Sequence, residues 1–295
     1  MKFEDSKTAR LIKNEIPYIS FPVFEQFPFI RHGFSTRLGG VSEGIYATMN
    51  LSYSRGDDAK CVTKNYERIS ESIGVDSHSL VASDQVHKTN LKRVGKSDCG
   101  KGIYKRRDYS EIDGIYTNEP GVTLVTSYAD CVPLLFVDPV KKVIAASHAG
   151  WRGTIGKIGP KTVKTMIREY QCDKKDIIVV IGPSICQDCY EVSKDVADQF
   201  KAAIDEARHE EMIPNQIDYF KNMKKDLSFA NKEKYQLNLW KANEYFLLEE
   251  GLDPKNVVIS SVCTCCNADL FHSHRASKGQ RGGLCAFLEI AESSK

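Results

Sequence analysis

Residues 128–153 read Tyr-Ala-Asp-Cys-Val-Pro-Leu-Leu-Phe-Val-Asp-Pro-Val-Lys-Lys-Val-Ile-Ala-Ala-Ser-His-Ala-Gly-Trp-Arg-Gly. Two short apolar runs, 132–137 and 143–146, flank an Asp138-Pro139 turn signal, so the segment predicts a β-hairpin. Cys131 precedes the first strand and His148 follows the second. A hairpin brings these two reactive side chains to the same end.

The distance between the two side chains depends on the turn. If Asp138 pairs with Lys141 around a two-residue turn, Cys131 lies opposite His148 with Cβ atoms about 5 Å apart. A four-residue turn leaves the two side chains diagonal on one face, whereas a three-residue turn places them on opposite faces. The first two registers give the spacing of metal ligands or of a catalytic dyad.

Size and composition are those of a soluble globular protein. The chain has 295 residues, of which 41% are hydrophobic and 27% charged. No low-complexity linker or repeat divides it, so we expect one domain over residues 1–295, with an N-terminal extension over residues 1–16. Lysine and arginine (41) nearly balance aspartate and glutamate (39). This balance gives no electrostatic reason to expect binding to nucleic acid or to a membrane.

The N-terminus and the cysteines predict the compartment. We find neither an apolar core of signal-peptide length nor a run of roughly 18 apolar residues, and we therefore expect a cytoplasmic protein. The ten cysteines would then stay reduced, and clustered thiols become candidate metal ligands before candidate disulfides. The sequence makes no prediction of the oligomeric state.

Strands and helices are both expected. Apolar spacing predicts a helix over 58–73, which Gly74 ends. Further helices are expected from near Pro160 to Tyr170, over 193–207 and over 237–250, and further strands over 122–127, 176–182, 257–262 and 284–290. This mixture predicts a large mixed sheet, or two packed sheets, covered by helices.

Cys131 and His148 need a third partner to hold a metal. His87, in Gln85-Val86-His87 at a strand end, is the best candidate. One thiolate and two imidazoles suit Zn²⁺ and leave the fourth tetrahedral position open, where a metal lowers the pKa of bound water towards neutrality. The alternative is that Cys131 is an ordinary buried thiol and His148 a hydrogen-bonded core histidine.

Several short motifs occur in order along the chain. They are His32-Gly-Phe-Ser-Thr-Arg-Leu-Gly-Gly-Val-Ser42, Gln85-Val-His87, Asp113-Gly114, Asp130-Cys-Val-Pro133, His148-Ala-Gly-Trp-Arg-Gly153 and Ile181-Gly-Pro-Ser184. Together they closely resemble the YfiH/YlmD-like family, also called laccase-domain proteins or multicopper polyphenol oxidases. The resemblance runs from about residue 30 to 290.

The resemblance implies a four-layer α/β/β/α sandwich with mixed sheets, and a single zinc held by His87, Cys131 and His148. It implies phosphorolysis of purine nucleosides (adenosine, inosine and methylthioadenosine), with adenosine deamination as a further activity. The expected small-molecule partners are therefore purine nucleosides and phosphate. Some relatives are described instead as copper-dependent phenol oxidases or as peptidoglycan editing factors.

Phosphorolysis requires a held phosphate, and the planar fork of arginine matches two phosphate oxygens. We expect Arg37, in the glycine-rich loop, and Arg152, as a catalytic residue, to bind phosphate. The alternatives are a loop-capping role for Arg37 and a structural ion pair for Arg152. His32 and Arg275 are further candidates for substrate contact, each with a structural alternative.

Two neighbours of the metal ligands have open roles. Asp130 either orients His148 or makes a structural hydrogen bond, since adjacent strand residues face opposite ways. Trp151 either packs in the core, which we favour, or stacks on a base.

Three rival functions stay open. The seven histidines include one His-X-His pair, at 272–274, which is too little for a four-copper oxidase, although copper can replace zinc at a single site. A thiol dyad of Cys131 and His148 could hydrolyse a peptidoglycan precursor. A zinc that only stiffens the fold would make the chain a non-enzymatic binding protein.

A second group of cysteines follows two expected strands. Its members are Cys186, Cys189, Cys263, Cys265 and Cys266. If the two strands are parallel neighbours, the thiols meet at one end, and four of them could bind a second, structural zinc or form redox bridges. The alternative is a set of separate reduced thiols.

Overall fold

The computed structural model describes residues 2–204, 220–222 and 234–292. The first of two six-stranded sheets contains, in spatial order, β1 (Arg10–Ile12), β2 (Tyr18–Ser20), β3 (Ile30–Ser35), β15 (Leu284–Ile290), β7 (Thr123–Tyr128) and β4 (Leu80–Ala82). The second contains β14 (Val257–Ile259), β10 (Ile178–Ile181), β8 (Val132–Asp138), β9 (Val143–Ala149), β6 (Gly114–Thr117) and β5 (Leu91–Arg93). A small third sheet contains β11 (Glu191–Ser193), β13 (Lys234–Leu237) and β12 (Phe220–Asn222).

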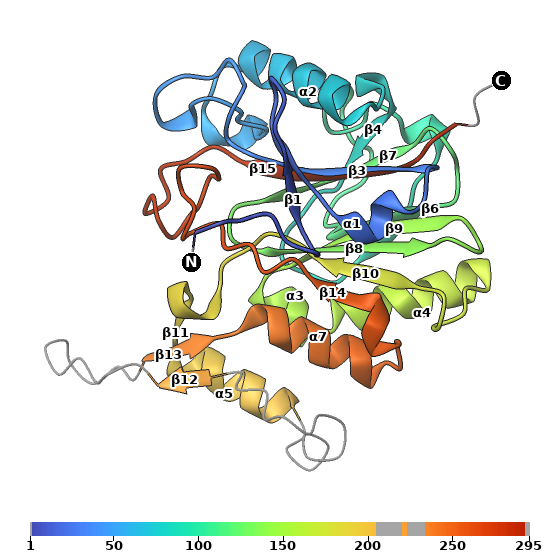
Figure 1. Cartoon of the computed structure of the whole chain (residues 1–295), viewed down its shortest axis with the longest axis vertical. Coiled ribbons are helices and arrows are strands. Elements are labelled where there is room, and N and C mark those ends of the chain that lie inside the picture. Colours follow the sequence, from blue (N-terminus) through green and yellow to red (C-terminus); the bar gives the residue numbers. More distant parts are fainter. Residues whose placement is uncertain (1, 205–219, 223–233, 293–295) are drawn as a thin grey trace, which may run out of the picture.

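Helices cover the outer faces of the two large sheets (Figure 1). The helices of the described residues are α1 (Pro22–Glu25), α2 (Ala59–Ile73), α3 (Trp151–Ile155), α4 (Ile158–Tyr170), α5 (Lys194–Ala203) and α7 (Leu239–Glu249). In Figure 1, α2 lies above the first sheet, whereas α3, α4 and α7 lie below the second. The layers are therefore helix, sheet, sheet and helix, and the expected four-layer α/β/β/α fold with mixed sheets is confirmed.

Three apolar layers hold this sandwich together. Between the sheets, Leu124 and Leu288 of the first sheet belong to one buried cluster with Leu135 and Val180 of the second. Strands with both faces covered bury every residue, as β8 and β9 do here. The continuous apolar runs of the hairpin follow from this double burial.

Helix α2 shows why the local sequence signals were reliable. The Asp58 side chain accepts a hydrogen bond from the Lys60 amide at the start of the helix, and Gly74 ends it with φ of 84°. Tyr66 and Ile69 on its buried face share a cluster with Phe287 of the first sheet. The helix predicted over 58–73 and its glycine stop are confirmed.

Other element boundaries differ by a few residues. Helix α4 begins two residues before Pro160, directly after the short helix α3, which the sequence did not predict as a separate element. Helix α5 ends at Ala203, and residues 205–207 of the helix expected over 193–207 lie outside the described residues. The predicted strand over 257–262 is shorter, because β14 pairs with β10 only as far as Ile259.

The register of the β8–β9 hairpin corrects one prediction. Asp138 pairs with Val143, so that four residues form the turn and Pro133 stands opposite His148. The two-residue turn was wrong because the Asp138 carboxylate accepts hydrogen bonds from the amides of Val140 and Lys141 and so holds a wider turn. The shift is an even number of residues, so Cys131 and His148 are diagonal on one face, as the four-residue alternative predicted.

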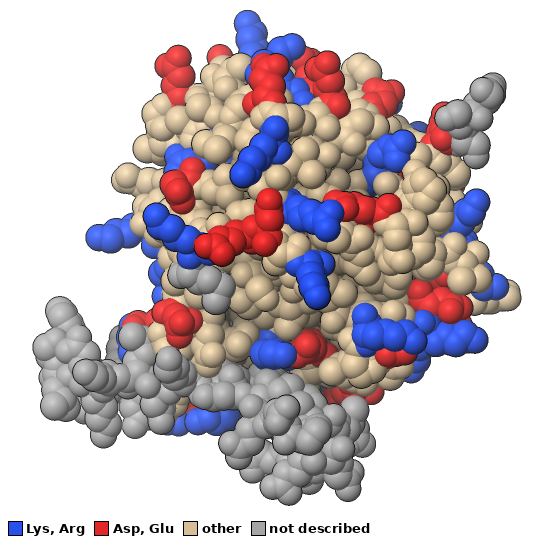
Figure 2. Space-filling model, viewed as in Figure 1, with Lys and Arg blue, Asp and Glu red and all other residues tan. Residues whose placement is uncertain are grey.

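Three further features concern the N-terminal strand, the charges on the surface and the apolarity of the helices. Strand β1 lies inside the expected extension over residues 1–16 and pairs with β2 at the edge of the first sheet. On the face in Figure 2, lysine and arginine side chains alternate with aspartate and glutamate. No helix among the described residues combines the length and apolarity needed to cross a membrane.

His32 belongs to the core and is not brought to the candidate site. Its Nε2 accepts a hydrogen bond from the Phe21 amide at 2.9 Å, and its ring stacks on Phe21 and meets Phe24 edge-on. Burial lowers the pKa of His32 to about 4, with weaker opposition from the hydrogen bond with the Phe21 backbone. The expected contact with substrate is therefore replaced by a packing role.

Neutral His32 makes folding pH-dependent. Its pKa is about 4 when folded and about 6.5 when unfolded, so its stabilisation is fully present above pH 6.5 and is lost as the pH falls towards 4. Across this window, protonation of His32 should lower the free energy of unfolding of the wild type by up to about 3 kcal/mol. His32→Gln keeps a hydrogen-bond acceptor but cannot titrate, so we expect the variant to lack this fall. Urea unfolding at pH 7, 5.5 and 4 measures it, and parallel stability curves for the two proteins would contradict it.

Candidate metal centre and adjoining pocket

Three side chains meet where the hairpin leaves the second sheet. His87, Cys131 and His148 place one potential ligand atom each within 4.8 Å of the others. The Cys131 Sγ lies 3.9 Å from the His87 Nε2, and the two imidazole rings stand nearly perpendicular, with centroids 4.8 Å apart. His148 is buried, Cys131 half-buried and His87 exposed. The group is thus closed on the protein side and open towards solvent at His87.

One carboxylate fixes two of these three side chains. Asp113, which is fully buried, accepts a hydrogen bond from the His148 Nδ1 at 2.9 Å and another from the His87 amide at 2.9 Å. The amides of Val86 and Lys88 donate to its second oxygen. Because Nδ1 donates to Asp113, Nε2 of His148 is left with its lone pair for a metal. This arrangement is the usual outer partner of a metal-binding histidine.

The backbone near these side chains has an unusual conformation at His87 and a close approach at Gly150. His87 has φ of 63°, a left-handed conformation that histidine adopts more readily than most residues. The Gln85 side chain pins the same loop to Ser127 through two hydrogen bonds. At Gly150 an added Cβ would lie 2.9 Å from His87 Cδ2 and 3.2 Å from Cys131 Sγ. Glycine at this position therefore leaves the space that the two side chains occupy.

The charges of the group favour a thiolate. Burial raises the pKa of the Cys131 thiol, but His148 and His87 outweigh this effect and lower it to about 6. Burial lowers the pKa of His148, whereas the Cys131 thiolate and Asp113 raise it to about 9. Without a metal, the pair is a thiolate beside an imidazolium. The site is therefore ready to exchange the imidazolium proton for a cation.

Asp130 takes the structural alternative. Its carboxylate accepts hydrogen bonds from Thr264 Oγ1 at 2.6 Å, Ser273 Oγ at 3.0 Å and the Arg275 amide at 2.7 Å. The orienting carboxylate of His148 is Asp113, so the proposed orienting role of Asp130 is wrong. The reason is topological: β6 lies beside β9, whereas Asp130 turns to the loops around Thr264 and Ser273.

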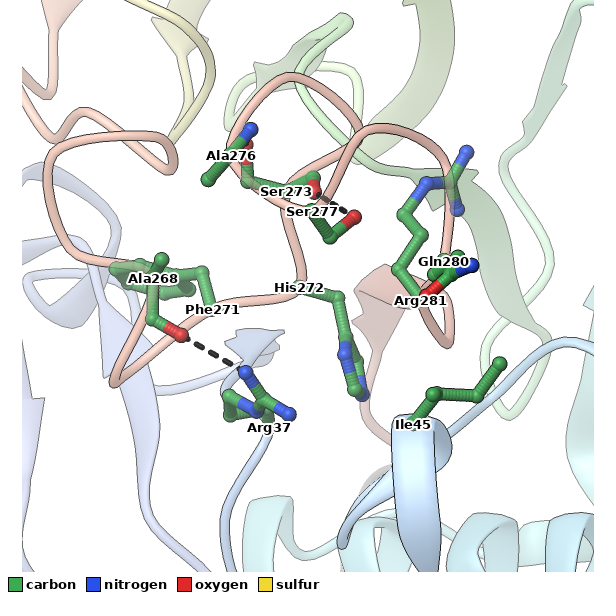
Figure 3. Close-up of a pocket in the computed structure, with 10 residues that line it drawn as sticks. All are labelled: Arg37, Ile45, Ala268, Phe271, His272, Ser273, Ala276, Ser277, Gln280 and Arg281. Carbon is green, nitrogen blue, oxygen red and sulfur yellow. Dashed lines mark hydrogen bonds between the residues drawn. The ribbon is translucent and has the colours of Figure 1, made fainter.

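Figure 3 shows a pocket of about 220 Å³ that is lined by residues from two parts of the chain, 37–45 and 268–281. Its lining residues are Arg37, Ile45, Ala268, Phe271, His272, Ser273, Ala276, Ser277, Gln280 and Arg281. The Ser273 wall touches Asp130, the residue before Cys131. This hydrogen bond connects the lining of the pocket to the residue that precedes Cys131.

Two nitrogen atoms at this pocket have no hydrogen-bond partner among the described residues. They are Nε of Arg281 and Nε2 of His272, both buried. Burial and Arg55 lower the pKa of Arg281 to about 10, while Asp130 and Cys131 act in the opposite direction. Burial, Arg37 and Arg281 lower the pKa of His272 to about 3, so it is neutral at pH 7. A half-buried guanidinium with an unsatisfied, buried Nε donor suits an anionic ligand.

The chain can now be compared with known proteins. A family model described as multi-copper polyphenol oxidoreductase laccase matches residues 31–291. The purine nucleoside phosphorylase YlmD of Bacillus subtilis (strain 168) is 36% identical over 264 residues, which cover 88% of each protein. The chain belongs to this family.

Solved structures agree with this assignment. The crystal structure of YlmD from Geobacillus stearothermophilus is 31% identical, with a TM-score of 0.84, and covers 96% of this chain and 99% of its own. The hypothetical protein YfiH of Bacillus licheniformis is 29% identical, with the same TM-score, over 96% of this chain and 98% of its own. The resemblance to the YfiH/YlmD-like family is confirmed.

The three predicted arginines lie around the centre in different ways. Arg37 donates three hydrogen bonds to the carbonyl groups of Ala47 and Ala268, which is the loop-capping geometry, and two of its five N–H donors remain. Arg152 is exposed, and its guanidinium lies 4.2 Å from the centre of the Trp151 ring. Arg275 donates to the carbonyl groups at positions 189 and 191.

Trp151 itself is half-buried against the cluster that underlies the second sheet, as the packing interpretation expects. Among the salt bridges of the described residues, none involves Arg152. Its expected alternative, a structural ion pair, is therefore not seen in that part of the chain.

The second cysteine group assembles from four of the five expected thiols. Cys186, Cys189, Cys263 and Cys266 place their Sγ atoms within 4.8 Å of one another, and Cys265 is outside the set. Strands β10 and β14 are the parallel neighbours that this meeting required.

Sequence reasoning missed the roles of Asp113 and Arg281. Asp113-Gly114 was visible as a motif, but its partner His148 is 35 residues away, and only the β6–β9 pairing joins them. Arg281 carries no local signal other than its neighbouring glycines, which let the chain pass close to His272.

The role of Asp113 can be measured. Asp113→Asn keeps the shape of the side chain but removes the charge that holds the His148 tautomer, so we expect zinc affinity to fall about 10- to 100-fold in chelator competition. Asp138→Asn is the matched control. Asp138 is an equally buried carboxylate, but it lies at the turn of the β8–β9 hairpin, at the opposite end from His148. Equal affinities for the wild type and both variants would contradict the role.

Proposed function

We propose that this protein is a zinc-dependent purine nucleoside phosphorylase that cleaves adenosine, inosine and methylthioadenosine, with adenosine deamination as a second activity. The observation that carries the proposal is the presence of an open His/Cys/His group together with a half-buried arginine whose buried Nε has no hydrogen-bond partner among the described residues. Relatives named as purine nucleoside phosphorylases support the substrate class.

The donor set fits a catalytic metal. One thiolate and two imidazoles from His87, Cys131 and His148 are ligands typical of Zn²⁺, and three protein ligands leave one position for a reactant. The orientation of His148 by Asp113 and the exposure of His87 support this choice over a closed structural site. When bound, the metal supplies Lewis-acid stabilisation of negative charge on a reactant oxygen.

The pocket can hold only part of a nucleoside. Its volume of about 220 Å³ is below the roughly 300–1,000 Å³ of sites that enclose whole drug-sized ligands. We infer that phosphate and ribose lie between Arg281 and the centre, with the base towards the open side near His87. Arg37, Arg152 and Arg275 stay candidates for further contacts, each with free N–H donors.

Phosphorolysis then needs little covalent work from the protein. A phosphate oxygen attacks C1′ of the ribose as the glycosidic bond to the base breaks, and the base leaves with the electron pair and takes up a proton. The products are ribose 1-phosphate and the free base. Arg281 holds the phosphate in line with C1′, and fixed positive charge close to the reacting oxygen lowers the barrier.

Deamination uses the same centre with a different second reactant. Water adds at C6 of adenosine and the exocyclic amino group leaves as ammonia, which gives inosine. The exposed side of His87 keeps the centre accessible to water. Because no phosphate is consumed, this activity can be measured alone in phosphate-free buffer.

Loss of one ligand should abolish both activities. We expect Cys131→Ala to lose the metal of this centre and to reduce both phosphate-dependent cleavage and inosine formation by roughly 100-fold or more. Cys61→Ala, which changes a thiol on α2, should keep both activities. Metal analysis and chromatography of the products measure the outcome, and full phosphorolysis by metal-free Cys131→Ala would refute the proposal.

The arginine makes a separate prediction. Arg281→Gln removes the guanidinium charge next to the pocket, so we expect the KM for phosphate to rise about 10- to 100-fold while deamination in phosphate-free buffer changes far less. Arg168→Gln, a surface change on α4, is the control. An unchanged KM for phosphate in Arg281→Gln would remove this residue from the site.

The rivals make different predictions. A thiol hydrolase needs the Cys131 thiolate free, so rapid alkylation of Cys131 in zinc-loaded protein would favour hydrolysis of a cell-wall precursor. Among the described histidines, only His87 and His148 share a ligand group, which supports a single ion and not a four-copper centre. A zinc that only stiffens the fold predicts no turnover of any nucleoside.

A reducing compartment suits this chemistry. All ten cysteines of the chain are free thiols, and two metal-type groups depend on them. We therefore propose that the protein works in the cytoplasm, where thiols stay reduced.

A further inference from the structure

The four-cysteine group joins two loops that follow neighbouring parallel strands. Each loop contributes a Cys-X-X-Cys pair: Cys186 and Cys189 after β10, and Cys263 and Cys266 after β14. Beyond the strands, an isolated parallel bridge links Ser184 to Cys263. Two such pairs brought face to face are the usual plan of a structural zinc site.

The sulfur atoms already have the spacing of a tetrahedron. Cys266 Sγ lies 3.4 Å from Cys189 Sγ and 3.8 Å from Cys186 Sγ. Four sulfurs bound to Zn²⁺ at about 2.3 Å would stand about 3.8 Å apart. A disulfide needs about 2.05 Å, so these sulfur atoms are not bonded to one another.

The backbone around the group is arranged for thiolates. The amides of Cys186 and Cys266 both donate to Cys263 Sγ, each at 3.3 Å. Such N–H groups favour the charged sulfur over the neutral thiol. Cys186 and Cys263 are buried, and four thiolates in one place repel one another unless a cation lies between them.

We propose that Cys186, Cys189, Cys263 and Cys266 bind a second Zn²⁺ as a closed, structural site, separate from the centre at His87, Cys131 and His148. Binding releases the thiol protons, and the metal closes a long chain segment between the two pairs. Joining the two ends of this segment lowers the conformational entropy of the unfolded chain. The bound ion therefore stabilises the folded state and acts as a clamp.

The clamp also supports the wall of the first centre. The Ile185 amide, beside the first pair, donates to the Asp130 carbonyl, and Thr264, inside the second pair, donates to the Asp130 carboxylate. Asp130 directly precedes Cys131. The Arg275 guanidinium donates to the Cys189 carbonyl. The second metal thereby holds the two loops whose hydrogen bonds position Asp130. It also holds the Cys189 carbonyl that binds Arg275.

Metal counting on the full chain tests the proposal. We expect protein purified with a thiol reductant to contain two zinc ions per chain by mass spectrometry, Cys131→Ala to contain one, and Cys189→Ser to contain one. Cys265→Ser is the matched control, because Cys265 lies between two of the ligands but outside the group, and it should keep both ions.

A spectroscopic measurement covers variants that fail to fold. Cobalt loaded into Cys131→Ala should show the intense sulfur-to-metal absorption of a tetrathiolate site, whatever becomes of Cys189→Ser. The melting temperature of Cys131→Ala should also fall on treatment with a strong chelator, which reports the clamp independently of any turnover.

The outcomes separate this site from the proposed enzyme. If Cys131→Ala keeps one zinc and lacks activity, both proposals stand; if wild type holds one zinc that Cys131→Ala retains, only the four-cysteine site survives. The four-cysteine proposal is overturned if Cys131→Ala holds no zinc or holds iron. It is also overturned if the protein mass is lower by two hydrogens for each bridge, or if Cys265→Ser loses as much metal as Cys189→Ser.

Discussion

The buried carboxylate of Asp113 is the constraint on which the rest of the centre depends. It receives the imidazole of His148 from β9 and three consecutive amides of the His87 loop. Burial raises the pKa of Asp113, but these hydrogen bonds outweigh burial and lower it, so the negative charge persists inside the protein. That charge ties the His87 loop to strand β9 and so gives the two histidines a common frame.

The second sheet supplies the frame in which this carboxylate works. Strands β6, β9, β8 and β10 are antiparallel neighbours. The start of one strand therefore lies beside the end of the next, at one end of the sandwich. Asp113 stands just before β6, His148 near the end of β9 and Cys131 just before β8. Beyond β10 the chain continues into the four-cysteine group, whose loops hold Asp130. The His/Cys/His group and the four-cysteine group thus lie at the same end of the second sheet, and Asp130 connects them.

Sequence patterns could predict this edge in part. The alternation rule correctly placed Cys131 and His148 on one face even though the turn length was misjudged, because an even shift in register preserves the face. The helix over 58–73 was predictable from its cap, apolar spacing and glycine stop. By contrast, the sequence left the role of Asp130 open between orienting His148 and a structural hydrogen bond, and His32 was expected near substrate although it packs beside Phe21. Both positions are decided by contacts between segments that local pattern does not join.

The sequence by itself determined the class of fold and the family, and it named the three side chains of the candidate metal centre, because periodic burial and short motifs are written in neighbouring residues. Tertiary structure alone decided which carboxylate holds His148, which four of five cysteines converge and that Arg281 lines a pocket with its Nε buried. These are distances across strand pairs and loops, set by the order of strands in the sheet. The physical reason is that hydrogen bonds and ion pairs depend on positions in space, whereas a sequence pattern reports only the surroundings that each residue requires.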